Sequence, residues 1–374
     1  MNKNPNIIII DQTIREGMQH KGIVFSYSQR QKIIEFQEKI GVDICQAGYP
    51  PAHVTEKDNV KKLNDFVKKQ GFKIKIAGMG RALVKDTRPL IETGIKDFHL
   101  HAHIHPGAGA KKEALFFSAI EECVKNIREQ EPAAKFSLAM LDIGKTDPDF
   151  LEKSADFLIN QLKINILSLP DTSGIIAPNL IYDYISPIAI KIRGTDTKIS
   201  IHCHNDMGMA SANTIMGIFA GATVIEASAL GIGERNGIAD IFTVGKILKD
   251  QGFVMNLNTD DIKTFKKYYE YVNKVYKTQT GEEIFNYNTP FFGDALKTHV
   301  AGTHGTTAFG ISHEEKFFLN TLCGQNLVKK YLKAANIPFR EEALHAITEE
   351  IKSQSASKNR RLQKTEIQAI TAGI

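Results

Sequence analysis

Short apolar runs alternate with longer amphipathic stretches along the first 250 residues of the chain. Apolar runs of this kind are typical of strands buried in a parallel sheet, and stretches with one polar face are typical of helices on its surface. The predicted strands are 6–10, 42–47, 73–77, 97–102, 135–141, 164–169, 198–204 and 223–229. The predicted helices between and after them are 28–40, 55–70, 83–93, 112–129, one opening at 147, 179–192, 210–220 and 240–250.

Helix end signals agree with this division of the chain. Ser28 is a candidate cap for the first long helix, Gly41 follows the end of the same helix, and Gly71 follows the end of the next one. Pro148 directly follows Asp147, as expected in the first turn of a helix.

Eight successive strand-then-helix units in about 250 residues predict a closed (β/α)₈ TIM barrel. An open doubly wound sheet is the alternative, because strand order cannot be read from a sequence. In a barrel the carboxyl ends of all strands meet at one face, where active sites lie. Polar residues at those ends are Arg15, Glu16, Gln46, His101, Thr172, His202 and His204.

The composition changes after the eighth unit. Residues 260–276 form a predicted charged helix rich in Tyr, 289–310 is rich in Gly and His, and further helices are predicted within 314–352. We therefore expect a barrel domain at 1–254 and a mostly helical C-terminal subdomain at 255–374.

Composition, charge and cysteine pattern are those of an ordinary soluble globular protein, with the reducing cytoplasm as the default location and small anionic substrates compatible. The 374 residues carry a net charge of +5, and the basic residues are scattered without interleaved aromatics, which argues against a nucleic-acid partner. The four cysteines form no CxxC pair. No secretory signal and no apolar run long enough for a membrane span is visible, so no membrane partner is expected.

The chemistry begins with His202 and His204. Alternate residues on a strand point to the same side, so both imidazoles face one way. A carboxylate from a neighbouring strand end, such as Glu16, would complete a three-point metal site that polarises a carbonyl oxygen. The alternative reading is a pair of core histidines.

Several segments together resemble the DRE-TIM metallolyases, the family of isopropylmalate, citramalate and homocitrate synthases and HMG-CoA lyase. Residues 11–19 match Asp-x-Thr-x-Arg-(Asp/Glu)-Gly-x-Gln, and 202–206 match His-x-His-Asn-Asp. Further matches are 231–237 (Gly-x-Gly-Glu-Arg), 298–304 (His-x-(Ala/Ser)-Gly-x-His) and the strand ends at 41–50 and 170–174. The resemblance spans residues 7–310.

The resemblance implies Glu16, His202 and His204 as ligands of a divalent metal, with Zn²⁺, Mn²⁺, Co²⁺ and Mg²⁺ all open. It implies Arg15 and His304 as catalytic residues, and a homodimer in which the 289–310 segment crosses into the partner's site. For Arg15 the alternative is a surface salt bridge, and for His304 a solvated loop histidine. Expected substrate-binding residues are Gln19, Gln46, His101, His103 and Thr172, although a turn or cap role is an equal alternative for Thr172. Expected supporting residues around the metal are Asp11, Asn205, Asp206, Glu234 and Arg235.

Three departures from the family pattern concern the substrate end of the site. The strand-five segment 136–142 lacks the usual glutamate, Gln46 replaces a glutamate, and strand four carries His99, His101, His103 and His105. The run Glu-Arg-Asn-Gly-Ile at 234–238, and Glu16 in place of Asp, resemble the pattern of homocitrate synthases.

The expected function is a metal-dependent Claisen-type condensation of acetyl-CoA with a 2-oxo acid. A retro-aldol lyase of the HMG-CoA lyase type and a catalytically silent barrel acting as a binding subunit are the alternatives.

Overall fold

The computed structural model describes residues 6–103, 109–140, 142–299 and 316–374. The chain forms two compact units, residues 1–285 and residues 286–374. His105, His304 and residues 300–310 of the predicted dimer-crossing segment lie outside the described residues.

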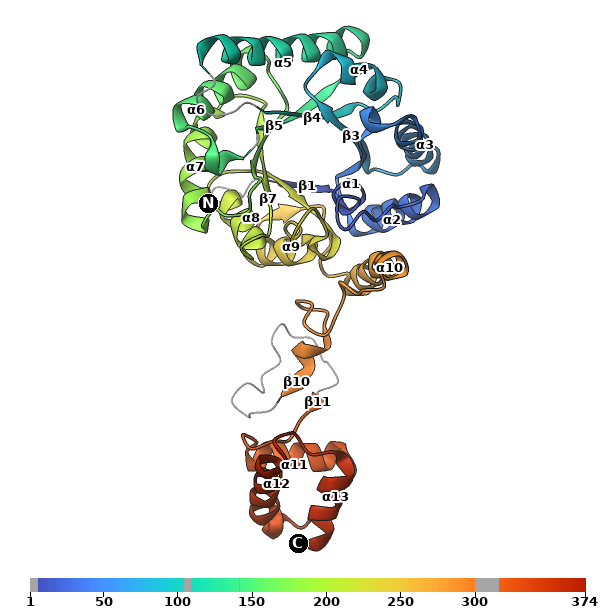
Figure 1. The fold of residues 1–374 in the computed structure, drawn as a ribbon, viewed down its shortest axis with the longest axis vertical. Coiled ribbons are helices and arrows are strands. Elements are labelled where there is room, and N and C mark those ends of the chain that lie inside the picture. The colour runs from blue at the N-terminus through green and yellow to red at the C-terminus, as the bar shows by residue number, and fades with distance from the viewer. Residues whose placement is uncertain (1–5, 104–108, 141, 300–315) are drawn as a thin grey trace. The chain divides into compact units, whose positions relative to one another are not determined.

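The first unit is a closed barrel (Figure 1). Within the described residues, eight parallel strands follow one another in sequence order, and β1 closes the ring by pairing with both β2 and β8. The strands are β1 (Asn6–Asp11), β2 (Ile44–Gly48), β3 (Lys75–Arg81), β4 (Asp97–Ala102), β5 (Lys135–Met140), β6 (Ile166–Asp171), β7 (Lys198–Cys203) and β8 (Val224–Ala227). A short ninth strand, β9 (Val254–Met255), extends the edge at the start of β1. The TIM-barrel prediction is confirmed, and the open sheet is excluded.

Helices surround the barrel on the outside (Figure 1). They are α2 (Tyr27–Ile40), α3 (Val54–Gln70), α4 (Val84–Ile91), α5 (Ala110–Gln130), α6 (Pro148–Asp156), α7 (Pro178–Lys191), α8 (Ala210–Phe219) and α9 (Ile241–Asp250), whereas the short α1 (Thr13–Gly17) directly follows β1 inside their ring. The prediction of Ser28 as a cap is wrong. The N-cap of α2 is Ser26, because Gln29 lies three residues later and completes a reciprocal capping box. Gly41 and Gly71 end their helices in the left-handed conformation, as expected.

The barrel interior is apolar at one end and polar at the other. Ile10, Ile44, Ala77, Ile166 and Val224 pack together inside the barrel. Because inward-facing positions recur every two residues, the next inward residues are the polar Gln46, Ser168 and Glu226. The barrel interior therefore changes from an apolar layer to a polar layer toward the carboxyl ends of the strands.

The Tyr-rich helix α10 (Ile262–Thr280) belongs to the barrel unit. Tyr268 and Tyr269 are fully buried, and their hydroxyls donate to Asp11 Oδ2 at 2.9 Å and Asp240 Oδ2 at 2.5 Å. These bonds tie α10 to β1 and to the start of α9. The units accordingly divide at 285/286, whereas the sequence analysis placed the domain boundary at 254/255.

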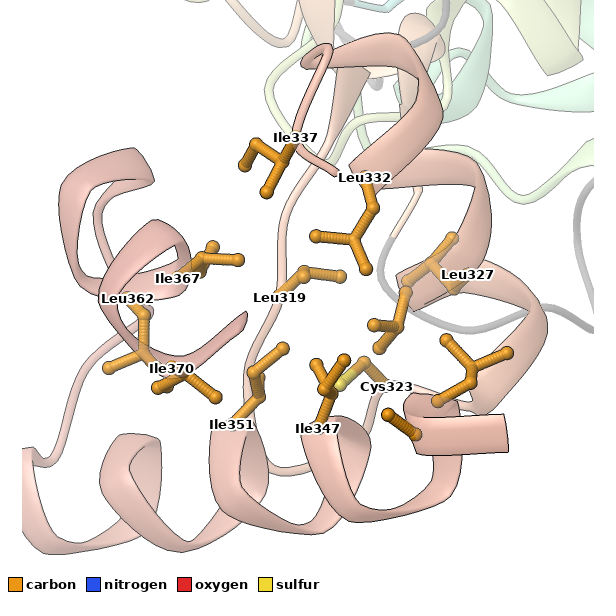
Figure 2. Close-up of a cluster of buried hydrophobic side chains, with 13 residues drawn as sticks. Leu319, Cys323, Leu327, Leu332, Ile337, Ile347, Ile351, Leu362, Ile367 and Ile370 are labelled. Carbon is orange, nitrogen blue, oxygen red and sulfur yellow. The ribbon is translucent and has the colours of Figure 1, made fainter. Parts of the chain in front are cut away.

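The second unit contains a small helical core (Figure 2). Its elements are β10 (Thr298–His299), β11 (Lys316–Phe317), α11 (Gln325–Ala334), α12 (Leu344–Lys358) and α13 (Lys364–Gly373). The two strands pair in parallel, and apolar side chains from all three helices fill the core. α13 begins with a capping box between Gln363 and Glu366, so this polar C-terminal stretch is helical.

Within the described residues, short helical turns lie between the longer elements. They are 3₁₀ turns at Pro50–Ala52, Ile143–Lys145, Ala229–Gly231, Asp294–Lys297 and Glu341–Ala343, and a π-helical turn at Phe157–Gln161. Among the described residues, the helices are all too short or too polar to cross a membrane.

Candidate active site

A cavity of about 660 Å³ opens at the carboxyl ends of the barrel strands. It brings together residues that are far apart in the sequence but were predicted to share a site. Those that line it are Arg15, Glu16, Gln19, His101, Thr172, His202, His204 and Glu234. Tyr49, Met79, Ser168 and Glu226 are among the further lining residues. Of the seven polar residues predicted at strand ends, all but Gln46 therefore line one cavity.

Local turn chemistry places α1 across the end of the barrel. Asp11 is the last residue of β1, and its Oδ1 accepts the Thr13 N–H at 2.8 Å while Oδ2 accepts the Tyr268 hydroxyl. Burial raises the pKa of Asp11 above its usual range. The bonds to Asp11 fix the first turn of α1, and that turn carries Arg15 and Glu16 into the cavity.

His202 and His204 lie side by side, as strand alternation predicted. Their side chains are almost completely buried, and their Nε2 atoms are 3.2 Å apart. Burial, followed by the neighbouring His202, lowers the pKa of His204 to about 3. His204 is therefore neutral near pH 7, which is the form in which imidazole binds a metal.

Glu16 is 1% exposed, and both of its oxygens face protein groups. Oε1 accepts the Glu234 N–H at 3.2 Å, and Oε2 forms an ion pair with Arg15. Burial acts to raise the pKa of Glu16, but the charge of Arg15 and the two imidazoles bring it below its usual value. Glu16 is thus held as a carboxylate inside the cavity.

The donors fit a divalent cation in chemistry but are not all turned toward one point. Among the described residues, no three His, Cys, Asp or Glu side chains are already grouped as a metal site, and Glu16 is engaged with Arg15. The imidazole pair has a suitable span, because two nitrogens each about 2.0–2.1 Å from one cation are about 2.9–3.4 Å apart. The observed Nε2 separation of 3.2 Å lies within that range. Glu16 Oε2 is buried and is held by the ion pair with Arg15.

Arg15 is held by the amide oxygens of three glutamines. Its Nε donates to Gln46 at 2.5 Å, Nη1 to Gln19 at 2.5 Å and Nη2 to Gln12 at 3.3 Å. Gln46 is buried, and its Nε2 lies 2.8 Å from His99 Nδ1. Gln19 and Gln46, which were predicted to bind substrate, therefore contact Arg15 in this structure. An amide can accept from Arg15 and donate to His99 at once, which a carboxylate cannot do.

The strand-four histidines are divided between different surroundings. His99 is buried inside the barrel, whereas His101 lines the main cavity with its Nε2 3.0 Å from the Tyr49 hydroxyl. Burial, assisted by the charge of Arg15, lowers the pKa of His101 to about 4. His103 follows the strand end and lines a second cavity of about 260 Å³, together with Arg81 and Phe116.

Thr172, Asp206 and Arg235 join the loops that follow β6, β7 and β8. Thr172 Oγ1 accepts the Asp142 N–H at 2.9 Å, which leaves the hydroxyl proton available to a ligand. Arg235 forms two 2.9 Å bonds to the Asp206 carboxylate and donates to the Thr172 carbonyl. The predicted Glu234–Arg235 pair is present at 3.8 Å, but Asp206 is the closer partner.

Asn205 supports the same loops. Its side-chain oxygen accepts the Ala210 N–H at 3.1 Å, and its N–H donates to the Gly237 carbonyl at 2.9 Å. The first bond ties the end of β7 to α8, and the second ties it to the loop after β8. Asn205 thus acts on the shape of the cavity rim through the backbone.

Glu226 is the site residue that the sequence analysis missed. It lies on β8, is 6% exposed, and accepts the hydroxyls of Ser168 at 2.6 Å and Ser200 at 2.7 Å. Its Oε2 accepts the Gln12 amide and lies 3.4 Å from His202 Nδ1. Burial acts to raise the pKa of Glu226, but His202 and the two serines bring it well below its usual range. The feature of the sequence that could have indicated Glu226 is a single carboxylate within the otherwise apolar strand β8.

Comparisons with known proteins give one family. The sequence model of the HMGL-like family matches residues 6–268. A 2-isopropylmalate synthase from Sulfurisphaera tokodaii is 30% identical over 92% of this chain and 89% of that protein. A homocitrate synthase AksA from Methanosarcina mazei is 26% identical over 98% of this chain and 90% of that protein. The solved structure of a hydroxymethylglutaryl-CoA lyase from Pseudomonas aeruginosa has a TM-score of 0.59 at 15% identity, covers 76% of this chain and 96% of that chain, and shares the fold.

Proposed function

The chain belongs to the HMGL-like family of TIM-barrel enzymes, and from this premise we propose that it condenses acetyl-CoA with a 2-oxo acid. The substrates are small molecules, a 2-oxo acid and an acyl-CoA, and the cofactor is a divalent cation. The observation that carries the proposal is the meeting of Arg15, Glu16, His202 and His204 in one cavity. A synthase is favoured over a lyase because the relatives named as synthases align with nearly the whole chain.

Glu16, His202 and His204 would hold the cation, which suits Zn²⁺, Mn²⁺, Co²⁺ or Mg²⁺. When bound, the ion withdraws electron density from the ketone group of the oxo acid. Glu16 has to turn from Arg15 to serve as a ligand, and this movement frees the guanidinium to meet the substrate. The ion pair between them thus links cation binding to substrate binding.

A base first removes a proton from the methyl group of acetyl-CoA, and the resulting enolate carbon attacks the ketone carbon. Arg15 stabilises the negative charge that develops on the ketone oxygen, which then takes up a proton. Its guanidinium is already oriented by Gln12, Gln19 and Gln46, so little reorganisation accompanies the reaction. The Thr172 hydroxyl, whose oxygen accepts the Asp142 N–H, donates a hydrogen bond to the carboxylate of the oxo acid. Water then cleaves the thioester and releases CoA.

The proposal includes a homodimer in which His304 of one subunit acts as proton donor or relay in the other. His304 follows Thr298 and His299 by a few residues, within the matched His-x-Ala-Gly-x-His segment. A His304→Ala substitution tests this part of the proposal. It is expected to lower kcat with little change in thermal stability, and mixing it with an Arg15→Ala variant is expected to restore part of the activity. No recovery in the mixed dimer would contradict the crossing segment.

The decisive assay is metal-dependent release of free thiol from acetyl-CoA. A panel of 2-oxo acids, including 2-oxoglutarate, 2-oxoisovalerate and pyruvate, is tested with and without a chelator. At least one acid is expected to elicit CoA release that the chelator abolishes and added cation restores. Cleavage of a hydroxyacyl-CoA without condensation would identify a lyase. No turnover in either direction, with no cation bound, would identify a silent binding subunit.

A further inference from the structure

We propose that Glu226 is a positioning residue that holds His202 in the tautomer and orientation needed to bind the cation through Nε2. The inference rests on the proposed function, because it concerns a ligand of the same cation. The Glu226 carboxylate is expected to accept a hydrogen bond from Nδ1–H of His202. The lone pair of Nε2 then stays free for the ion. Carboxylates that orient metal-bound histidines in this way raise metal affinity and fix the ligand geometry.

The two nitrogens of His202 face different neighbours. Nε2 lies 3.2 Å from His204 Nε2, on the side of the proposed cation. Nδ1 lies 3.4 Å from Glu226 Oε2 and has no hydrogen-bond partner among the described residues. A neutral imidazole carries its proton on one nitrogen only, so the acceptor near Nδ1 decides which nitrogen stays free. Glu226 is the acceptor that the structure places there.

Glu226 is held firmly enough to perform this task. Oε1 accepts the hydroxyls of Ser168 and Ser200, and Oε2 accepts the Gln12 amide. These donors come from β6, β7 and the end of β1, so the carboxylate is fixed from three strands. A buried carboxylate with this many donors retains its charge and its position. The same bonds occupy the oxygens and favour a supporting role over direct metal binding.

Strand register explains how the pair forms. His202 on β7 pairs with Glu226 on β8, and Ser168 on β6 pairs with Ser200. Paired residues on adjacent strands point to the same side of the sheet, which in a barrel is the interior. His204 lies beyond the end of β7, and its Nδ1 has no hydrogen-bond partner among the described residues. The two ligands are therefore unequal: among the described residues, His202 Nδ1 lies 3.4 Å from the buried Glu226 carboxylate, and His204 forms no such ion pair.

The first test measures cation binding directly by titration calorimetry with Mn²⁺ and Co²⁺. Glu226→Gln preserves the shape of the side chain and removes its charge, and Glu226→Asp retains the charge but withdraws it from Nδ1. Each is expected to bind the cation about 10–100-fold more weakly than the wild type. Asp240→Asn is the control, because Asp240 is a partly buried carboxylate that is likewise held by hydrogen bonds, but from Tyr269 and Thr243. This control is expected to retain wild-type cation affinity.

The second test needs no substitution at Glu226 and so does not depend on variant folding. Protein labelled with ¹⁵N-histidine is loaded with Zn²⁺, and long-range ¹H–¹⁵N spectra report which nitrogen of His202 bears the proton. The His202→Asn protein assigns the signal. A protonated Nδ1 and a metal-bound Nε2 are expected.

The outcomes separate this inference from the proposed function. Unchanged cation affinity in a folded Glu226 variant, or binding of His202 through Nδ1, would overturn the role of Glu226 and leave the proposed function standing. A wild-type protein that binds no divalent cation would overturn both.

Discussion

Replacing Arg15 with Lys tests whether the guanidinium fork, rather than its charge, supports the proposed reaction. Arg15 contacts the amide oxygens of Gln46, Gln19 and Gln12 and the carboxylate of Glu16. A Lys ammonium has three donors on a single atom and cannot meet these separated acceptors and a substrate oxygen together. Loss of one directed donor to a developing oxyanion typically costs about 10²–10³ in kcat. We expect a decrease of that size, with KM for the oxo acid changed far less.

The stability cost of Arg15→Lys is expected to be about 1–3 kcal/mol, because up to three glutamine oxygens lose their donor. Each glutamine oxygen that loses its partner costs about 1 kcal/mol, and a Lys at this position recovers part of it. Arg128→Lys is the matched control, because Arg128 is also partly buried and donates to the Leu162 carbonyl at 2.7 Å, outside the cavity. Initial rates of CoA release over a range of oxo acid concentrations separate kcat from KM. A decrease of less than tenfold, or an equal loss in the Arg128 variant, would refute the reasoning.

Three further predictions follow from other contacts. His101→Gln is expected to flatten the pH dependence of unfolding between about pH 4 and 6.5. Within that window the unfolded chain binds the proton that folded His101, with its pKa of about 4, does not, so wild-type stability rises with pH by up to about 3 kcal/mol. Urea titrations at several pH values measure this, and an unaltered pH profile would contradict it. Tyr268→Phe is expected to lower the free energy of unfolding by about 1–3 kcal/mol, because Asp11 loses a buried donor. The control is Tyr271→Phe on the same helix, whose ring packs against Phe36, and an equal loss in both variants would count against the Asp11 contact. Mn²⁺ at about 100 times its Kd is expected to stabilise the wild type by about 2.7 kcal/mol but not a double His202→Ala, His204→Ala variant, as judged by thermal unfolding.

The barrel was predictable because its signal is repeated. Most strands are apolar runs bounded by polar residues, and the observed bounds differ from the predicted ones by only a few residues. Local errors arose where two signals competed. Ser26 and Ser28 are both good caps, and only the Gln29 side chain, three residues after Ser26, selects between them.

The extent of the first unit could not be read from composition. α10 carries so many charges that it resembles the start of a separate domain, yet Phe265, Tyr268 and Tyr269 are fully buried. Their partners, Asp11 and Asp240, are distant in the sequence. The charge pattern of a helix predicts which face is exposed to solvent. It does not predict which part of the protein the opposite face packs against.

The site was predictable in its positions but not in its contacts. Strand alternation correctly placed His202 and His204 on one side, because that rule depends only on backbone geometry. It could not show that Gln46 faces Arg15 or that Glu16 is paired with its own neighbour, since both depend on side-chain packing across strands. Glu226 escaped notice because one carboxylate in an apolar run gives no periodic signal.

Glu226 illustrates what an acidic residue within an otherwise apolar barrel strand indicates. Burying a carboxylate costs several kcal/mol unless donors surround it, so a strand that contains one must face a polar layer of the barrel. Ser168, Ser200 and Gln12 are those donors, and each occupies an inward position next to the predicted ligands. The lone acidic residue of β8, taken together with Ser168 in β6 and Ser200 in β7, therefore marks the level in the barrel at which the apolar interior ends and the polar cavity begins. His202 is paired in register with Glu226, so the same alternation that turns its side chain into the cavity also brings its Nδ1 to Glu226.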